Sequence, residues 1–137
     1  MQVALSGPVV LLRLDHGEDI LESVKQAVKD EKSTMLVMTG LGMVHDFEIG
    51  YFDRGTYLKK RIEEPCELLA MQGSIASSGE PRIHIHVTVA DTEHRAFGGH
   101  LIGGKAWMSN EIGLLRLEGH ASERKFDPDK KVGILQV

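Results

Sequence analysis

Short stretches in which apolar and polar residues alternate, separated by turn residues at near-regular intervals, constrain the fold of this chain more than any other feature. Residues 46–51 and 82–89 show this period of two most clearly. Successive side chains of a strand point to opposite faces, so both stretches predict half-buried β-strands. Further strands are predicted at residues 8–14, 35–38, 57–62, 66–75, 96–102, 105–109, 111–117 and 132–137. Gly40 and Gly42 are expected to stop the strand that begins at Met35.

A single segment, residues 18–30, shows helical spacing. Its apolar residues fall on one face: Ile20, Leu21, Val24, Ala27 and Val28. Asp15 and Glu18 precede it three positions apart, the spacing of a capping box. The chain has 137 residues, without a linker, a repeat or a low-complexity tract. These features predict one α+β domain over residues 1–137, an antiparallel-rich mixed sheet with one amphipathic helix packed on it.

Composition excludes several classes of protein. The 16 basic and 20 acidic residues give a formal net charge of −4, which lacks the positive field that non-specific binding to duplex DNA uses. The single cysteine, Cys66, rules out an intrachain disulfide and is predicted to be a small core residue. The longest apolar run, residues 9–12, is too short to span a bilayer, and the first residues do not resemble a signal peptide. A cytoplasmic location without membrane contact is expected.

The segment from Arg82 to Val89 carries the most informative polar residues. Its isoleucines and valines share one strand face, and His84 and His86 lie on the other face with Arg82 and Thr88. The two imidazoles are then about 7 Å apart along the strand, close enough to share a metal ion.

A third histidine, His100, follows the next turn. In a hairpin, His100 can stand opposite His84 or His86 if the strands pair residues whose numbers have an even sum. A three-residue loop or a bulge allows this, and Gly98-Gly99 is the natural place for the bulge. Three imidazoles suit Zn, Ni, Cu or Fe and leave one coordination position open. The alternative is that these are ordinary surface histidines.

The other candidate residues have weaker patterns. His16 borders the helix start, and His94 lies in a polar turn. Neither His45 nor His120 has a partner pattern, so surface or capping roles are expected for all four. Trp107 is interpreted as a core or interface anchor. Glu111 is either a solvated strand residue or a catalytic base. The chain contains no dinucleotide-binding fingerprint, no P-loop, no G-x-S-x-G elbow and no C-x-x-C pair.

Seven short motifs, in register over residues 9–137, resemble the plants-and-prokaryotes-conserved domain, which is also found in plant AT-hook nuclear proteins. The motifs are Gly17-Glu18-Asp19-Ile20-Leu21, Gly40-Leu41-Gly42, Gly50-Tyr51-Phe52-Asp53, Glu67-Leu68-Leu69 with Gly73, His84-Ile85-His86, Gly98-Gly99-His100-Leu101 and Glu111. Each motif alone is short, and their common order and spacing carry the resemblance.

The resemblance implies an α+β domain that assembles as a homotrimer. It also implies that His84, His86 and His100 are ligands of a divalent metal, commonly zinc, near a subunit interface. Two departures limit what carries over. The sequence has no Arg-Gly-Arg-Pro AT-hook, and Pro65-Cys66 stands where plant members have an arginine-aromatic pair. DNA binding is thus suggested by the family and not by these residues.

Three functions remain open at this point. The first is a homotrimeric, metal-binding interaction or regulatory module with protein partners and a transcription-related role. The second is a small three-histidine metalloenzyme with an interface pocket and Glu111 as proton acceptor. The third is a direct DNA binder, which the acidic balance disfavours.

Overall fold

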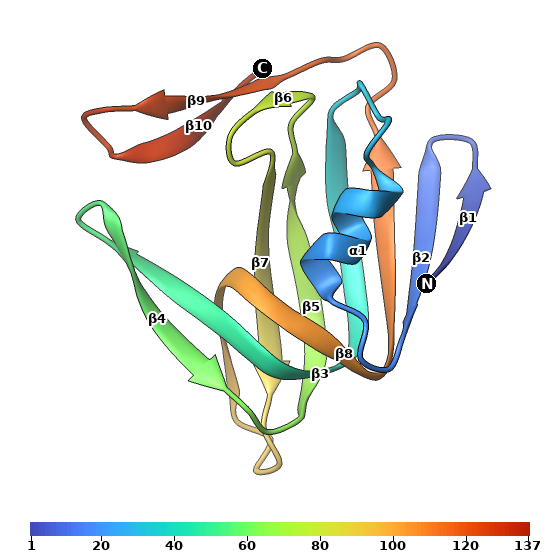
Figure 1. Cartoon of the computed structure of the whole chain (residues 1–137), viewed down its shortest axis with the longest axis vertical. Coiled ribbons are helices and arrows are strands. Elements are labelled where there is room, and N and C mark those ends of the chain that lie inside the picture. The colour runs from blue at the N-terminus through green and yellow to red at the C-terminus, as the bar shows by residue number, and fades with distance from the viewer.

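Two long, bent strands organise the structure, a computed structural model that describes residues 1–137 (Figure 1). They are β3 (Met35–Asp53) and β8 (Ala96–Arg116), which pair with each other over most of their length. The remaining elements are β1 (Gln2–Ser6), β2 (Val9–Asp15), α1 (Ile20–Ala27), β4 (Thr56–Ile62), β5 (Cys66–Ile75), β6 (Ser78–Gly79), β7 (Ile83–Ala90), β9 (Glu123–Asp127) and β10 (Val132–Gln136).

The main sheet has seven antiparallel strands in the order β1-β2-β8-β7-β5-β3-β4. Because β8 also pairs with β3, the strands β3, β8, β7 and β5 form a closed circuit of pairings. A small second sheet, in the order β10-β9-β6, contains the parallel pair β6–β9 and lies at one end of the molecule (Figure 1). The prediction of a mostly antiparallel α+β domain is confirmed.

Both long strands are longer than predicted. The expected stop at Gly40 and Gly42 is wrong, because β3 continues through both glycines. Gly42 has a φ of 124°, and the register of β3 with β8 shifts directly after it, so this glycine bends the strand without ending it. Likewise, β8 joins the three strands predicted at 96–102, 105–109 and 111–117.

Helix α1 packs on the sheet, where it contacts β8 and β2 and lies in front of β3 and β8 in Figure 1. Its buried face is formed by Ile20, Val24 and Val28, which join a core of 23 buried apolar residues. The helix is shorter than the predicted 18–30, and its N-cap is Asp19, whose carboxylate accepts the backbone N–H of Glu22 at 2.9 Å.

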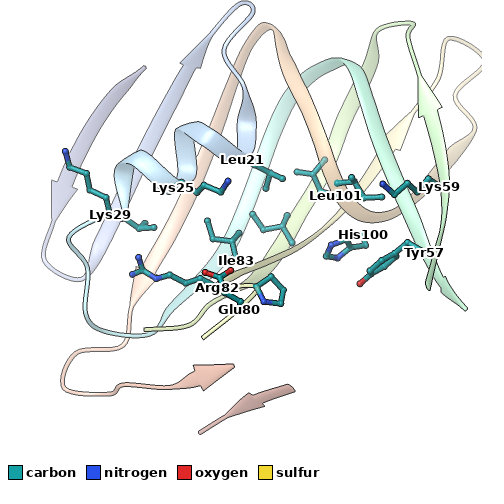
Figure 2. A pocket seen from close by; sticks show the side chains of 14 residues that line it. Leu21, Lys25, Lys29, Tyr57, Lys59, Glu80, Arg82, Ile83, His100 and Leu101 are labelled. Atoms are coloured by element: carbon teal, nitrogen blue, oxygen red, sulfur yellow. The ribbon is translucent and has the colours of Figure 1, made fainter. Parts of the chain in front are cut away.

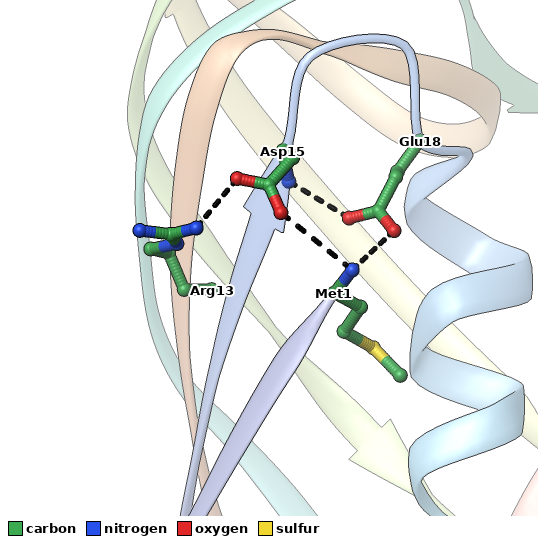
Figure 3. Close-up of polar contacts among 4 residues, drawn as sticks. All are labelled: Met1, Arg13, Asp15 and Glu18. Atoms are coloured by element: carbon green, nitrogen blue, oxygen red, sulfur yellow. Dashed lines mark hydrogen bonds and ion pairs between the residues drawn. The ribbon is translucent and has the colours of Figure 1, made fainter.

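The residues predicted to form the capping box instead anchor the start of the chain (Figure 3). Glu18 accepts the backbone N–H of Asp15 at 2.7 Å and the amino group of Met1. Asp15 pairs with Arg13 at 2.6 Å. This network holds β1 against β2. Strand β1 is an edge strand that the sequence pattern did not predict. No helix is long and apolar enough to cross a membrane.

Candidate metal centre

Strand β7 presents His84 and His86 on one face, as its alternating sequence predicts. Ile85, Val87 and Val89 on the opposite face are at most 5% exposed and belong to the core. The two histidine rings turn toward each other, so that their Nε2 atoms lie 3.1 Å apart. Burial of the aliphatic face therefore fixes both imidazoles on the other side of the strand.

Strand β8 brings the third histidine to the same place. His86 stands directly opposite His100 in the β7–β8 pairing. A five-residue turn, Asp91 to Arg95, joins the two strands and gives the paired residue numbers their even sum. The pairing contains no register shift. The predicted bulge at Gly98-Gly99 is therefore wrong. Gly98 allows close approach of strands instead: a Cβ at this position would lie 2.1 Å from the carbonyl oxygen of Val87.

The three side chains form a compact cluster. One ligand atom from each of His84, His86 and His100 lies within 4.8 Å of the others. The ring centroids of His84 are 5.0 Å from those of His86 and His100, and the latter two are 5.6 Å apart. The structure thus confirms that the predicted residues meet; their role as ligands stays a prediction.

The electrostatics of the cluster favour the neutral imidazole that a metal requires. Burial, followed by the positive charges of His84, His86 and Arg124, lowers the pKa of His100 to about 4. Burial and the charges of His86 and Arg124 also lower the pKa of His84. The Nδ1 atom of His100 is buried without a hydrogen-bond partner. A buried polar atom without a partner is unfavourable, so the donor set fits a bound cation.

Tyr57 on β4 covers one side of the cluster. Its ring stacks on His100 with a centroid separation of 4.6 Å and an interplanar angle of 21°. Gly50 pairs with His100 across β3 and β8, and a Cβ there would lie 2.7 Å from the Tyr57 ring. Because Gly50 has no side chain, there is space for the Tyr57 ring to contact His100.

The proposed catalytic base is not brought to this cluster. Glu111 pairs with Arg13 and Leu41 on the outer face of the sheet, and it lines a separate depression with Leu11 and Arg13. The carboxylate that lines the cavities beside His100 belongs to Glu80, which the sequence analysis did not single out.

The remaining candidates lie away from the histidine cluster. His16 and His45 stack on each other, with ring centroids 5.6 Å apart, and both contact the edge of Trp107. Trp107 is half-buried and lies outside the apolar core, so the predicted core role is not confirmed and an interface role stays a prediction. Cys66 is buried, and burial, followed by the negative charges of Asp91 and Glu64, raises the pKa of its thiol, as expected for an inert core cysteine.

Comparison with known proteins gives a family and a set of similar structures. Residues 1–118 match the model of the Plants and Prokaryotes Conserved (PCC) domain. A metal-containing protein of Archaeoglobus fulgidus is 29% identical, with a TM-score of 0.84 over 96% of this chain and 94% of that chain. A plant- and prokaryote-conserved protein of Pyrococcus horikoshii is also 29% identical, with a TM-score of 0.84 over 99% and 95%.

Two other similarities carry different descriptions. A proposed DNA-binding protein of Ralstonia eutropha JMP134 is 26% identical, with a TM-score of 0.85 over 98% of this chain and 95% of that chain. The bifunctional protein GlmU of two Synechococcus strains is 28% and 30% identical over 129 residues, which are 92% of this chain. The chain spans only about a fifth of the length of these curated relatives, 19% and 20%.

Proposed function

This chain belongs to the Plants and Prokaryotes Conserved domain family, and we propose that it is a metal-binding member that acts as a homotrimeric interaction or regulatory module. The single observation that carries the proposal is the cluster of His84, His86 and His100, with one ligand atom each within 4.8 Å. The metal-containing Archaeoglobus fulgidus relative supports it.

Zinc is the ion we propose for the cluster. Three imidazoles without a thiolate form a donor set that suits zinc and other borderline divalent ions. Bound there, such an ion would keep one position open and supply Lewis acidity. The chain's own residues hold the imidazoles neutral and oriented: β7 and β8 fix their spacing, and Tyr57 stacks on His100.

Exposed apolar residues support self-association. Five of them lie on strands of the main sheet: Val9 and Leu11 on β2, Met38 and Leu41 on β3, and Leu69 on β5. All five are between 45% and 54% exposed. Apolar surface exposed on a sheet in this way is typical of interaction sites in soluble proteins. We assign it to contacts between copies of this chain, and a transcription-related role would then act through protein partners.

A small metal-dependent enzyme is the second candidate. The observation in its favour is that two cavities meet at His100, because both are lined by Tyr57, Glu80, Pro81 and His100. In that case Glu80 replaces Glu111 as the carboxylate near the cluster.

Metal analysis of untagged protein tests the proposal. The purified wild-type chain should contain one divalent ion per chain by mass spectrometry of dissolved metal, and the variant His84→Ala/His86→Ala should contain none. The matched control is His94→Asn, in an exposed turn with a φ of 60° that asparagine tolerates. Full stoichiometry in the double variant would place the metal elsewhere.

A further inference from the structure

Arg124 on β9 is a buried charge that has no acidic partner. Its side chain is only 5% exposed, and no carboxylate lies within 4.0 Å of it. The guanidinium donates to Ser74 Oγ at 2.9 Å and weakly to the Gly133 carbonyl at 3.5 Å, while its Nε has no partner. A buried cation is costly unless it is paired, so this environment calls for an anion.

The surroundings of Arg124 are also positive. It lines a cavity of about 250 Å³, here called the arginine cavity, together with His84, His100 and Lys131. Glu80 is the only carboxylate among the twelve lining residues. Its side chain is exposed and makes no ion pair with Arg124. A divalent ion on the histidines would add to this unbalanced charge.

A second cavity adjoins the first at His100 and Tyr57. This apolar cavity has a volume of about 670 Å³ and runs between α1 and β4 (Figure 2). Leu21, Ile83 and Leu101 contribute apolar surface, and its volume lies in the range of small-molecule sites. Four basic side chains also line it, against one carboxylate, Glu80: Lys25, Lys29, Lys59 and Arg82.

We propose that the two cavities together bind a small organic oxyanion, a carboxylate or phosphate ester with an apolar body. Its acid group lies at Arg124 beside the histidine cluster, and its body extends along Leu21, Ile83 and Leu101. The proposal rests on the proposed function in that the metal increases the attraction for the acid group. Arg124 and the apolar lining supply the rest of the recognition.

Nuclear magnetic resonance of the zinc-loaded protein tests this inference. The Nε–Hε resonance of Arg124, assigned by its loss in Arg124→Met, is followed during titration with acetate, hexanoate, butyl phosphate and neutral hexanol. Each buried methylene strengthens binding by roughly three- to fourfold, so hexanoate should bind at least tenfold more tightly than acetate. Hexanol, which lacks the charge, should leave the resonance in place. The tighter of hexanoate and butyl phosphate identifies the acid group.

Variants separate the anion site from the fold. Arg124→Met should weaken hexanoate binding at least tenfold, measured by calorimetric titration of both proteins because this variant lacks the reporter resonance. Because a buried substitution can disturb folding, Lys131→Gln provides a second test: Lys131 is exposed at the cavity mouth, and its loss should weaken binding severalfold. Lys130→Gln is the matched control, since Lys130 lies in the same turn but pairs with Asp127 outside the cavity.

The outcomes for the metal and for the anion are distinct. Stoichiometric zinc with no response of Arg124 to either acid overturns the inference and leaves the proposed function standing. Hexanoate binding that equals acetate binding, or that survives both Arg124→Met and Lys131→Gln, also overturns it. Binding of hexanoate at Arg124 in a protein that takes up no zinc supports the anion site and refutes the metal.

Discussion

Acidification of the metal-free protein should reduce its stability through His100, because the folded state holds this imidazole neutral. Burial, together with the charges of His84, His86 and Arg124, lowers its pKa to about 4. In the unfolded chain the pKa returns to about 6.5. Between these values the unfolded state binds a proton that the folded state does not. The free energy of unfolding should therefore fall as the pH drops from about 6.5 to about 4.

The size of the effect follows from the two pKa values. One pH unit corresponds to about 1.4 kcal/mol per proton, so the full window gives an upper bound of about 3 kcal/mol. The ring of His100 is only partly shielded from water, and solvent screening reduces the electrostatic part. We expect a loss of about 1 to 2 kcal/mol attributable to this residue.

Urea unfolding with a chelator, at about pH 7 and about pH 4.5 and at one protein concentration, measures the loss. The variant His100→Asn has no titrating group here, so its stability should fall by about 1 to 2 kcal/mol less than that of the wild type. His94→Asn, in the exposed turn, should show the wild-type fall. Equal falls in the wild type and in His100→Asn would refute the reasoning.

Three further predictions concern packing, assembly and DNA. Gly98→Ala should lower the free energy of unfolding by about 1 to 3 kcal/mol, because its Cβ would lie 2.1 Å from the Val87 carbonyl oxygen. Gly103→Ala, where a Cβ meets nothing within 4 Å, is the control, and equal stabilities would contradict the packing argument. Light scattering should give three times the 15.1 kDa chain mass, and a single-chain mass would exclude the trimer. Titration with duplex DNA at about 150 mM salt should show no sub-micromolar binding, because the net charge is −4.

The alternating strand at 82–89 was predictable because one physical rule decides it. Burial of Ile85, Val87 and Val89 on one face requires His84 and His86 on the other. The amphipathic stripe of α1 was readable for the same reason, although only residues 20–27 are helical. Residues whose burial follows from the pattern of their own strand or helix could thus be placed on the correct face.

The residues supplied by distant segments could not be found in this way. Arg124 lies in a five-residue strand of mostly charged residues, without an apolar pattern to predict it. It reaches the cluster only because β9 pairs with β6 and β10 in the small sheet at one end of the molecule. Tyr57 depends in the same way on the β3–β4 pairing and on the space that Gly50 leaves. These contacts are set by long-range pairing, which local sequence patterns do not encode.

The divergence of two strands explains why the cluster is open to a ligand. Strand β8 pairs with β7 from Ala96 to His100, and from His100 onward it continues along β3, opposite Gly50 and Ile49. His84 therefore pairs with Ser74 on one side and has no partner in β8 on the other. Had β8 stayed beside β7, backbone would fill the space next to His84. The separation at His100 instead leaves that space lined by side chains: His84 lines the arginine cavity, and His100 lines both the arginine cavity and the apolar cavity.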